Sequence, residues 1–575
     1  MSNFFKDNED LLFQFENLHL EDVIRSREND FADAKSAEGR TYAPFDVEDA
    51  MDNYRRVLEL MGDIAGEFIA PRAPEVDREG AHFDNGRVTY ARGTAEALER
   101  LSQAGLMGMT LPREYGGLNF PTTIYMMAIE IISRADASLM NIFGLQDIAE
   151  TIHRFADAEI QSEYLPKFCN GEVTGAMALT EPDAGSDLQA VKTRAFQDEA
   201  GNWYLSGVKR FITNGCGDVL LVLARSEEGT EDARGLSLFV CNRDGVQVRR
   251  IENKLGIHGS PTCEIQFNNT PCKLIGERKR GLITYVMSLM NGARLGVAAQ
   301  ALGIAQAAYV EAFKYAHERE QFGKAICHFP AVAEMLINMK VNIETSRSLL
   351  YATAKAVDKR GELERQLNRA KALGQPFKEL NDKLKQATRV TAFLTPYTKY
   401  MITELANQIC YDAIQVHGGT GFMQEFNVER HYRDVRITTI YEGTSQLQIV
   451  AATGGATTGV LDSLLDEYEQ QSYTGELQPL HQQLIEIRER FKECRDYLAK
   501  KDDPAYQELR SRNLVELYGS LYVGYLVLNE AKISEKKLLV AKKYISDSYA
   551  KALMHAEQIL HGYDTMPMFK FVTAV

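Results

Sequence analysis

The sequence has no excess of positive charge, which limits the ligands it can bind. Lys and Arg number 65 against 80 Asp and Glu, so the formal net charge is −15 and the pI is about 5.4. Sequence-independent binding of nucleic acid requires a basic face. We therefore expect no nucleic-acid partner for the chain as a whole, although this net charge is compatible with a local basic patch.

Metal-type cysteine motifs, long apolar runs and a secretory start are also missing. The eight cysteines are scattered and none forms CxxC, which is typical of reduced residues in a cytosolic protein. No apolar run of membrane-spanning length is evident. The start, "MSNFFKDNEDLLFQFENLHLED", is acidic and polar, unlike a signal peptide. We expect a cytoplasmic protein without an integral membrane segment.

What is present is a long chain whose hydrophobic period changes twice. Its 575 residues exceed the size of one domain, and 45% hydrophobic with 25% charged residues is an ordinary globular balance. Apolar residues first recur at intervals of three and four residues, as in helices. They then occur in short β-rich runs, and afterwards the helical interval returns. Because strands and helices do not alternate, a Rossmann sheet is not expected.

This pattern predicts a segment order. The predicted segments are an N-terminal extension (1–50), a helical domain (51–175), a β domain (176–280), a helical-bundle domain (281–460) with a charged hairpin (358–389), and an additional helical domain (461–575).

Two stretches of the β region combine small, polar and aromatic residues. "ALTEPDAGSD" (178–187) places Gly185 where the backbone can approach a flat or anionic ligand. "KRFITNG" (209–215) places Phe211 and Thr213 on one face of a strand. Taken alone, a surface turn and an ordinary sheet face are the better interpretations.

Two further stretches follow long helices. "HEREQFGK" (317–324) contains Arg319, which can make two parallel hydrogen bonds to a phosphate. Alternatively, its charge simply stabilises the C-terminus of the helix. "QVHGGTGF" (415–422) has three glycines after a helix, so it is no dinucleotide fingerprint, which follows a strand. His417 and His431 are too isolated to predict a metal site.

A single carboxylate lies near the end of the second helical region. In "RITTIYEGTSQLQIV" (436–450), Glu442 sits between Tyr441 and Gly443 with no second acid beside it. Taken alone, it is an acid before a helix, stabilised by the N-terminal dipole. Its interpretation depends on the other motifs.

The order and spacing of these motifs resemble those of the acyl-CoA dehydrogenase family over about residues 51–455. The extension, the charged hairpin and the helical C-terminal addition are similar to the larger bacterial members. The resemblance implies a mainly α fold with a middle β domain: a helical N-terminal domain, a β-barrel or sandwich and a C-terminal four-helix bundle, here with an added helical segment. It also implies FAD as the cofactor.

By resemblance, the flavin site is built from several segments. The implied cofactor-binding residues are Leu179, Thr180, Gly185, Ser186, Phe211, Ile212, Thr213, Arg319, Gln321, Gln415, Gly418, Gly419, Thr444 and Gln446. Arg319 and Gln321 are expected to contact FAD across a subunit boundary. Many members have Trp where this chain has Phe211. Many also have glutamine where this chain has Pro330, so the adenosine contact of that glutamine is not expected here.

The resemblance gives Glu442 the role of catalytic base, which removes the α-proton of an acyl thioester. The implied substrate residues are Ser186, Arg294, Tyr441 and Gly443. Some members carry the base elsewhere, at the position occupied here by Ala293, so Glu442 is the single candidate. Gln146 and Asp147 are candidates to meet a polar acyl group, or equally to serve a helix terminus.

The expected reaction makes trans-2-enoyl-CoA and passes electrons to an electron-transfer flavoprotein. A homodimer is preferred, with a tetramer as the other option. One alternative is a flavin oxidase that uses O₂ on a thioester or a nitroalkane. Another is a DNA-binding relative used in alkylation protection, against which the acidic balance counts.

Overall fold

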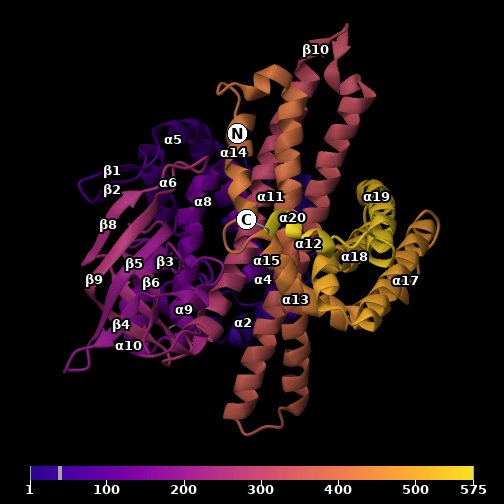
Figure 1. Ribbon diagram of the computed structural model, residues 1–575. Helices are drawn as coiled ribbons and strands as arrows, with labels where there is room; N and C mark the ends of the chain where they lie inside the picture. Colours follow the sequence, from indigo (N-terminus) through magenta and orange to yellow (C-terminus); the bar gives the residue numbers. More distant parts are fainter. Residues whose placement is uncertain (1, 36–41, 574–575) are drawn as a thin grey trace. The chain divides into compact units, whose positions relative to one another are not determined.

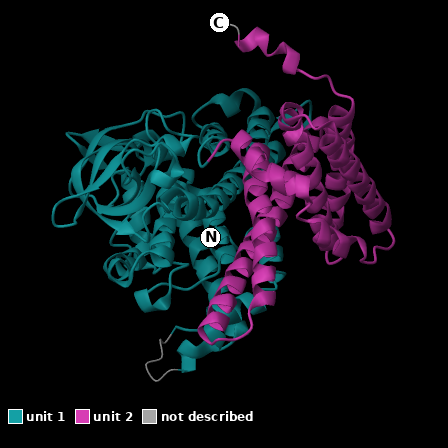
Figure 2. Ribbon diagram, turned by 60° about the horizontal axis from the view of Figure 1, so that its bottom comes forward, with its two compact units in different colours: residues 1–325, 406–442 teal, residues 326–405, 443–575 magenta. Residues whose placement is uncertain are grey.

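The computed structural model describes residues 2–35 and 42–573 and divides into two compact units. Unit 1 comprises Met1–Ala325 and Ala406–Glu442, and unit 2 comprises Ile326–Leu405 and Gly443–Val575 (Figure 2). The chain is mainly α with a middle β region, as the sequence predicts.

Unit 1 begins with a helical layer in which α7 packs against α4 and α8. Its helices are α1 (Glu9–Glu16), α2 (Glu21–Arg27), α3 (Ala32–Lys35), α4 (Val47–Asp63), α5 (Ala73–Glu79), α6 (Arg92–Gln103), α7 (Thr122–Ala135), α8 (Ala137–Phe143), α9 (Asp147–Phe155) and α10 (Ala158–Asn170). A small hairpin, β1 (His82–Asp84) and β2 (Arg87–Thr89), interrupts them and was not predicted.

The described part of the N-terminal extension is integral to this helical layer rather than a separate arm. Phe5, Phe15 and Ile24 are almost fully buried. Glu28 forms a buried ion pair with Arg113, well along the chain. The sequence pattern showed weak helices but not that their apolar faces are covered.

The β region forms a closed ring of pairings. Its strands are β3 (Gly175–Ala178), β4 (Arg194–Gln197), β5 (Trp203–Thr213), β6 (Val219–Arg225), β7 (Leu236–Asn242), β8 (Val246–Ile251) and β9 (Thr262–Ile275). The pairings β6–β4, β4–β5, β5–β9, β9–β7 and β7–β6 close a small barrel, with β3 and β8 added alongside (Figure 1). Because β3 and β4 pair with β6 in parallel, the sheet is mixed rather than purely antiparallel.

A long helix, α11 (Met287–Glu318), continues from the barrel and packs against α7, α8 and α9. A Cβ at Gly303 would lie 2.5 Å from the carbonyl oxygen of Glu130, so α7 and α11 approach closely there. The helical stretch Gly281–Glu318 is long and apolar enough to cross a membrane, and 56% of its apolar window is buried inside the structure. A core helix passes the same test.

The rest of unit 1 surrounds the end of α11. A short hairpin, β10 (Glu320–Gln321) and β11 (Lys324–Ala325), follows α11 directly. The C-terminal part of α13, the turn Gly418–Phe422, α14 (Val428–Val435) and the turn Arg436–Thr439 complete the unit.

Unit 2 is entirely helical in its described residues. Its helices are α12 (Pro330–Ala372), the first part of α13 (Lys378–His417), α15 (Ser445–Thr458), α16 (Asp462–Glu469), α17 (Leu477–Lys501), α18 (Pro504–Glu530), α19 (Glu535–Leu560) and α20 (Lys570–Thr573). Helix α18 packs against α12, α15, α17 and α19, so the C-terminal addition shares one core with the long helices.

The charged stretch forms the predicted helical hairpin, made by the end of α12 and the start of α13, with the reversal at residues 373–377 (Figure 1). Helix α13 begins at Lys378, within the charged stretch, and Pro396 lies inside it. A proline removes one helical hydrogen bond, and the turns on either side of it keep this 40-residue helix continuous.

Candidate functional site

The loop around Glu442 has a strained backbone. Glu442 has φ 55° and the next residue, Gly443, has φ 95°, so two successive residues are left-handed. A non-glycine residue in this region costs about 1–3 kcal/mol and persists only where its surroundings hold it. Glu442 is therefore a residue whose direction the fold enforces.

Tyr441, just before Glu442, is held by a buried polar network within unit 1. Its hydroxyl donates to the side-chain oxygen of Gln300 on α11 and lies 3.3 Å from Asn141 Oδ1 on α8. Gln300 is fully buried and donates to Asn141 at 2.8 Å. Burial and the Glu442 charge together raise the pKa of Tyr441, so its hydroxyl stays protonated.

Gly443, just after Glu442, is held by two donors within unit 2. Its carbonyl oxygen accepts from Lys399 Nζ at 2.8 Å and from Gln448 Nε2 at 2.9 Å. Both donor side chains are fully buried. A Cβ at Gly443 would lie 2.7 Å from Gln448 Nε2, so the position requires glycine for space as well as for φ.

The two predicted flavin residues beyond Gly443 make contacts within unit 2. Thr444 is the N-cap of α15, its hydroxyl accepting from Leu447 N at 3.4 Å. Gln446 is exposed and its side-chain oxygen accepts from Arg512 of α18 at 3.3 Å.

Two ionisable groups of unit 1 interact electrostatically with Glu442. Burial lowers the pKa of Arg294, and the charge of Glu442 opposes that shift. Burial and Glu150 raise the pKa of Asp147 to about 8, and Glu442 adds to that rise. Of the two residues predicted to meet the acyl group, Gln146 points elsewhere, since its side-chain oxygen accepts from Gly108 N at 2.6 Å.

The loop that follows β3 is anchored by an ion pair that the motifs did not reveal. Lys209 on β5 is fully buried and donates to the carbonyl of Leu179 at 2.8 Å and to Glu181 at 2.9 Å. Glu181 also accepts from the backbone N–H groups of Lys192 and Thr193. Held in this way, the loop leaves the predicted flavin residues Gly185 and Ser186 exposed.

Phe211 lies at a bulge in β5 with φ 60°, and 53% of its surface is exposed. Its neighbour Ile212 is buried and Thr213 is half-buried, in agreement with Phe211 and Thr213 sharing one face. The Arg210 guanidinium lies 4.7 Å from the Phe211 ring centroid. An exposed aromatic ring on a strained bulge is suited to packing against a flat ligand.

The structure brings the two helix-end motifs together. Tyr315 of α11 stacks on His417 with ring centroids 4.3 Å apart, and its hydroxyl accepts from Thr420. Arg319 and Gln321, at the end of α11 and in β10, are exposed. Gln415, Gly418 and Gly419 are exposed as well, and a Cβ at either glycine would meet nothing within 4 Å.

Within unit 1 the predicted cofactor residues thus form two groups. One lies just after β3 and on β5 and includes Leu179, Thr180 and Phe211, whereas the other lies around the end of α11 and β10, away from the barrel (Figure 1).

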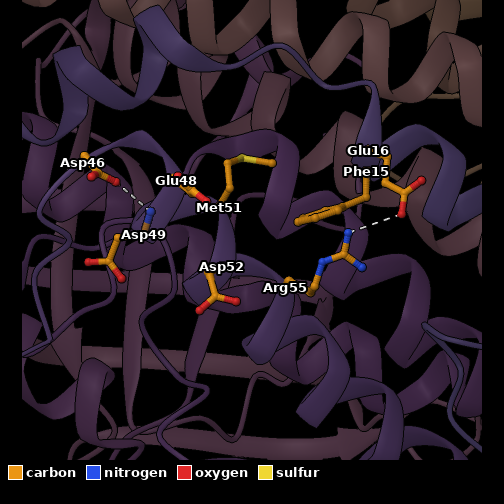
Figure 3. Close-up of a pocket in the computed structure, with 8 residues that line it drawn as sticks. All are labelled: Phe15, Glu16, Asp46, Glu48, Asp49, Met51, Asp52 and Arg55. Carbon is orange, nitrogen blue, oxygen red and sulfur yellow. Dashed lines mark hydrogen bonds and ion pairs between the residues drawn. The ribbon is translucent and has the colours of Figure 1, made fainter.

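A pocket that no motif predicted lies beside α1 and α4 (Figure 3). Asp46, Glu48, Asp49 and Asp52 line it, and Arg55 pairs there with Glu16 at 3.4 Å. Asp46 caps α4 through the backbone N–H of Asp49. Across residues 2–35 and 42–573, no group of three or more His, Cys, Asp or Glu side chains could hold a metal ion.

Family models cover most of the chain. The N-terminal domain of acyl-CoA dehydrogenase matches residues 51–172, the middle domain matches 176–270, and the C-terminal domain matches 280–453. A further model, acyl-CoA dehydrogenase C terminal, matches residues 457–561.

Relatives agree with these matches. The chain is 32% identical to 3-methylmercaptopropionyl-CoA dehydrogenase of Ruegeria pomeroyi, over 91% of this chain and 92% of that one. A chain from a study of the electron transferring flavoprotein of Acidaminococcus fermentans is 30% identical, with a TM-score of 0.59 over 70% of this chain and 97% of that one. An acyl-CoA dehydrogenase complexed with FAD from Bacillus anthracis shares the fold, with a TM-score of 0.75, 24% identity and coverage of 91% and 90%. The chain belongs to the acyl-CoA dehydrogenase family.

Proposed function

We propose that the protein oxidises an acyl-CoA thioester to a trans-2-enoyl-CoA with FAD as cofactor and Glu442 as the base. The observation that carries this proposal is the enforced backbone at Glu442. The loop is fixed on one side through Tyr441 and on the other through Gly443. A lone surface acid at a helix start needs neither the strain nor the two anchors.

The residues present fit FAD. The exposed ring of Phe211 offers a flat apolar face, and the small residue Gly185 leaves the neighbouring loop open. Gly418 and Gly419 offer backbone free of side chains to a second part of the cofactor. When bound, FAD supplies the two-electron chemistry by accepting the β-hydrogen with its bonding electrons.

The side chains around Glu442 account for the proton transfer. The Glu442 carboxylate takes the α-proton, and the electrons of the α C–H bond become the new double bond as the β-hydrogen leaves. The cation of Arg294 favours the ionised carboxylate. The anchors of Tyr441 and Gly443 hold the carboxylate so that it can face the α-proton of the thioester. This positioning of the base contributes to catalysis.

The proposal extends to partners. Arg319, Gln321, Gln415, Gly418 and Gly419 are exposed at one end of α11, where they are available to the FAD of a second subunit. We therefore expect a homo-oligomer, with a dimer preferred over a tetramer. Electron-transfer flavoprotein is the proposed electron acceptor, in line with the likeness to the chain from the Acidaminococcus fermentans study.

The test is anaerobic bleaching of the bound flavin by a panel of acyl-CoA thioesters. Glu442→Gln should slow bleaching by about 10²–10⁴-fold, the usual cost of losing a general base. Glu425→Gln, which removes an exposed carboxylate of the same unit, should bleach like the parent. Equal rates for parent and Glu442→Gln would disprove the assignment, and rapid H₂O₂ formation without an acceptor would identify an oxidase.

A further inference from the structure

The Asp147 carboxyl lies beside Gly292, near the start of α11. Asp147 is the first residue of α9, and its Oδ2 lies 3.9 Å from the position that a Cβ on Gly292 would occupy. Among the described residues no other group outside the helix comes within 4 Å of that position. Gly292 itself is exposed, and Asp147 is half-buried.

The same turn of α11 carries a residue that interacts with the proposed base, Glu442. Arg294 lies two residues after Gly292 and is close enough to Glu442 for that carboxylate to affect its pKa. Glu442 also acts on Asp147 directly. Asp147 of α9 and Glu442 of the strained loop therefore interact electrostatically within unit 1.

Two buried donors close to the Glu442 loop have no acceptor among the described residues. Arg294 is 8% exposed and its Nε is unpaired, while Asn141 is 7% exposed and its Nδ2 is unpaired. The Tyr125 hydroxyl is buried beside Asp147, which contributes to raising its pKa. Buried donors without acceptors are costly and indicate a ligand or water that supplies them.

We propose that Asp147 is a specificity-determining residue that hydrogen bonds an uncharged oxygen substituent on the acyl group, beyond the β-carbon. This inference rests on the proposed function and names the substrate class. The substituent must lie beyond the β-carbon because the α- and β-carbons react. Hydroxyl and oxo groups fit, because each can accept a hydrogen bond from a protonated carboxyl or from the unpaired Arg294 Nε–H, two residues after Gly292.

The charges around Asp147 favour an uncharged substituent. Burial and Glu150 raise the pKa of Asp147 to about 8, with Glu442 adding to the rise, so the carboxyl is mainly neutral at pH 7. An anionic acyl group would be repelled by Glu150 and Glu442. A cationic one would have to approach Arg294. The neutral carboxyl donates one hydrogen bond and accepts another.

The experiment compares kcat/KM of the FAD-loaded enzyme, with an artificial electron acceptor, on pairs of thioesters of equal heavy-atom count. The pairs are 4-hydroxybutyryl-CoA with pentanoyl-CoA, 5-hydroxypentanoyl-CoA with hexanoyl-CoA, and 6-hydroxyhexanoyl-CoA with heptanoyl-CoA. We expect at least one hydroxyacyl member to be preferred by about tenfold or more, since an unpaired buried group penalises the alkyl partner.

Variants separate recognition from folding. Asp147→Leu should abolish or reverse the preference, whereas Asp147→Asn, which keeps a neutral hydrogen-bonding group, should retain it. Gly292→Val should lower kcat/KM for the hydroxyacyl member most, because it fills the space in front of Asp147. Gln146→Ala is the matched neighbour, whose side chain serves Gly108; it should change thermal stability but not the preference.

The outcomes are distinguishable. If all pairs react equally within about threefold and Asp147→Leu changes nothing, while Glu442→Gln still blocks bleaching, the Asp147 inference is wrong and the proposed function stands. A marked preference for an ω-amino or ω-carboxy analogue would also overturn it. If no thioester bleaches the parent flavin, both proposals fail.

Discussion

Two loops of the proposed site are each held by a fully buried lysine that binds a backbone carbonyl. Lys209 donates to Leu179 and Lys399 donates to Gly443, both at 2.8 Å. In both cases the amine points inward and fixes a peptide group rather than a ligand. The loops nevertheless differ in what accompanies the lysine.

The first loop, which follows β3, is held by an ion pair, whereas the second, around Glu442, is held by two donors to one backbone carbonyl. Lys209 forms an ion pair with Glu181 at 2.9 Å, and burial lowers the pKa of Lys209 to about 8 against the effect of that pair. The Gly443 carbonyl instead adds the neutral amide of Gln448. Loss of Lys209 leaves the Glu181 carboxylate buried without its cation, whereas loss of Lys399 leaves the Gly443 carbonyl with Gln448 as a donor. We therefore expect the first anchor to affect stability more and the second to affect the geometry of the Glu442 loop more.

Removing the charged anchor should have the largest effect on stability. Lys209→Met leaves Glu181 as a buried carboxylate without its cation, which should lower the free energy of unfolding by about 3–5 kcal/mol. Denaturant unfolding measures the change. Lys192→Met is the control, because Lys192 is exposed and its pairing with Asp183 at 4.0 Å should contribute under about 1 kcal/mol. Equal losses in the two variants would remove the distinction between the loops.

The second anchor should affect catalysis more than folding. Lys399→Met leaves the Gly443 carbonyl with Gln448, so the loss of stability should be about 1–3 kcal/mol. Displacement of Glu442 should slow anaerobic flavin bleaching by up to about 10²-fold at saturating thioester. Lys383→Met, at an exposed position of the same helix, should leave both quantities unchanged. If Lys399→Met unfolds the protein while Lys209→Met only slows flavin bleaching, the roles that we assign to the two anchors are reversed.

The architecture was largely predictable because it rests on local patterns. The runs at β5, β6, β7 and β9 alternate or cluster apolar residues between turn signals, and the structure places strands there. The start of α13 was not predictable in the same way. A charged, exposed helical stretch has no apolar stripe to mark its continuity, and Pro396 suggests a boundary that the packed helix overrides.

The anchors of the site could not be predicted, because their partners are distant in sequence. Lys399 is 44 residues from Gly443, and Gln300 is 159 residues from Asn141. A lone lysine or glutamine in a helix carries no local signal of burial. The motif residues themselves were selected by resemblance, and their roles stay predictions.

The charged anchor should also respond to acid. Burial opposes ionisation of Glu181, but Lys209 and hydrogen bonds from Thr193 and Lys192 outweigh it, so the pKa of Glu181 is lowered from 4.5. A lowered carboxyl pKa contributes stability that is present above pH 4.5 and is lost as the pH falls through the folded-state value. The deficit of Glu181→Gln relative to the parent should therefore shrink below pH 4.5 in denaturant titrations. A deficit that is constant from pH 7 to pH 3 would show that the pair is not ionic.

The smallest effect should come from the strained residue that the first loop positions. Phe211 is left-handed like Glu442, but its ring is half exposed. Phe211→Gly removes some burial and relieves a left-handed cost of about 1–2 kcal/mol, so stability should change by under about 1 kcal/mol. Phe211→Val keeps the strain and adds a branched Cβ, so it should be less stable than Phe211→Gly. Both variants should hold FAD more weakly in a dilution assay. If Phe211→Val instead matches the parent in stability, the backbone of the bulge can relax. The fold would then impose a left-handed backbone at Glu442 but not at Phe211.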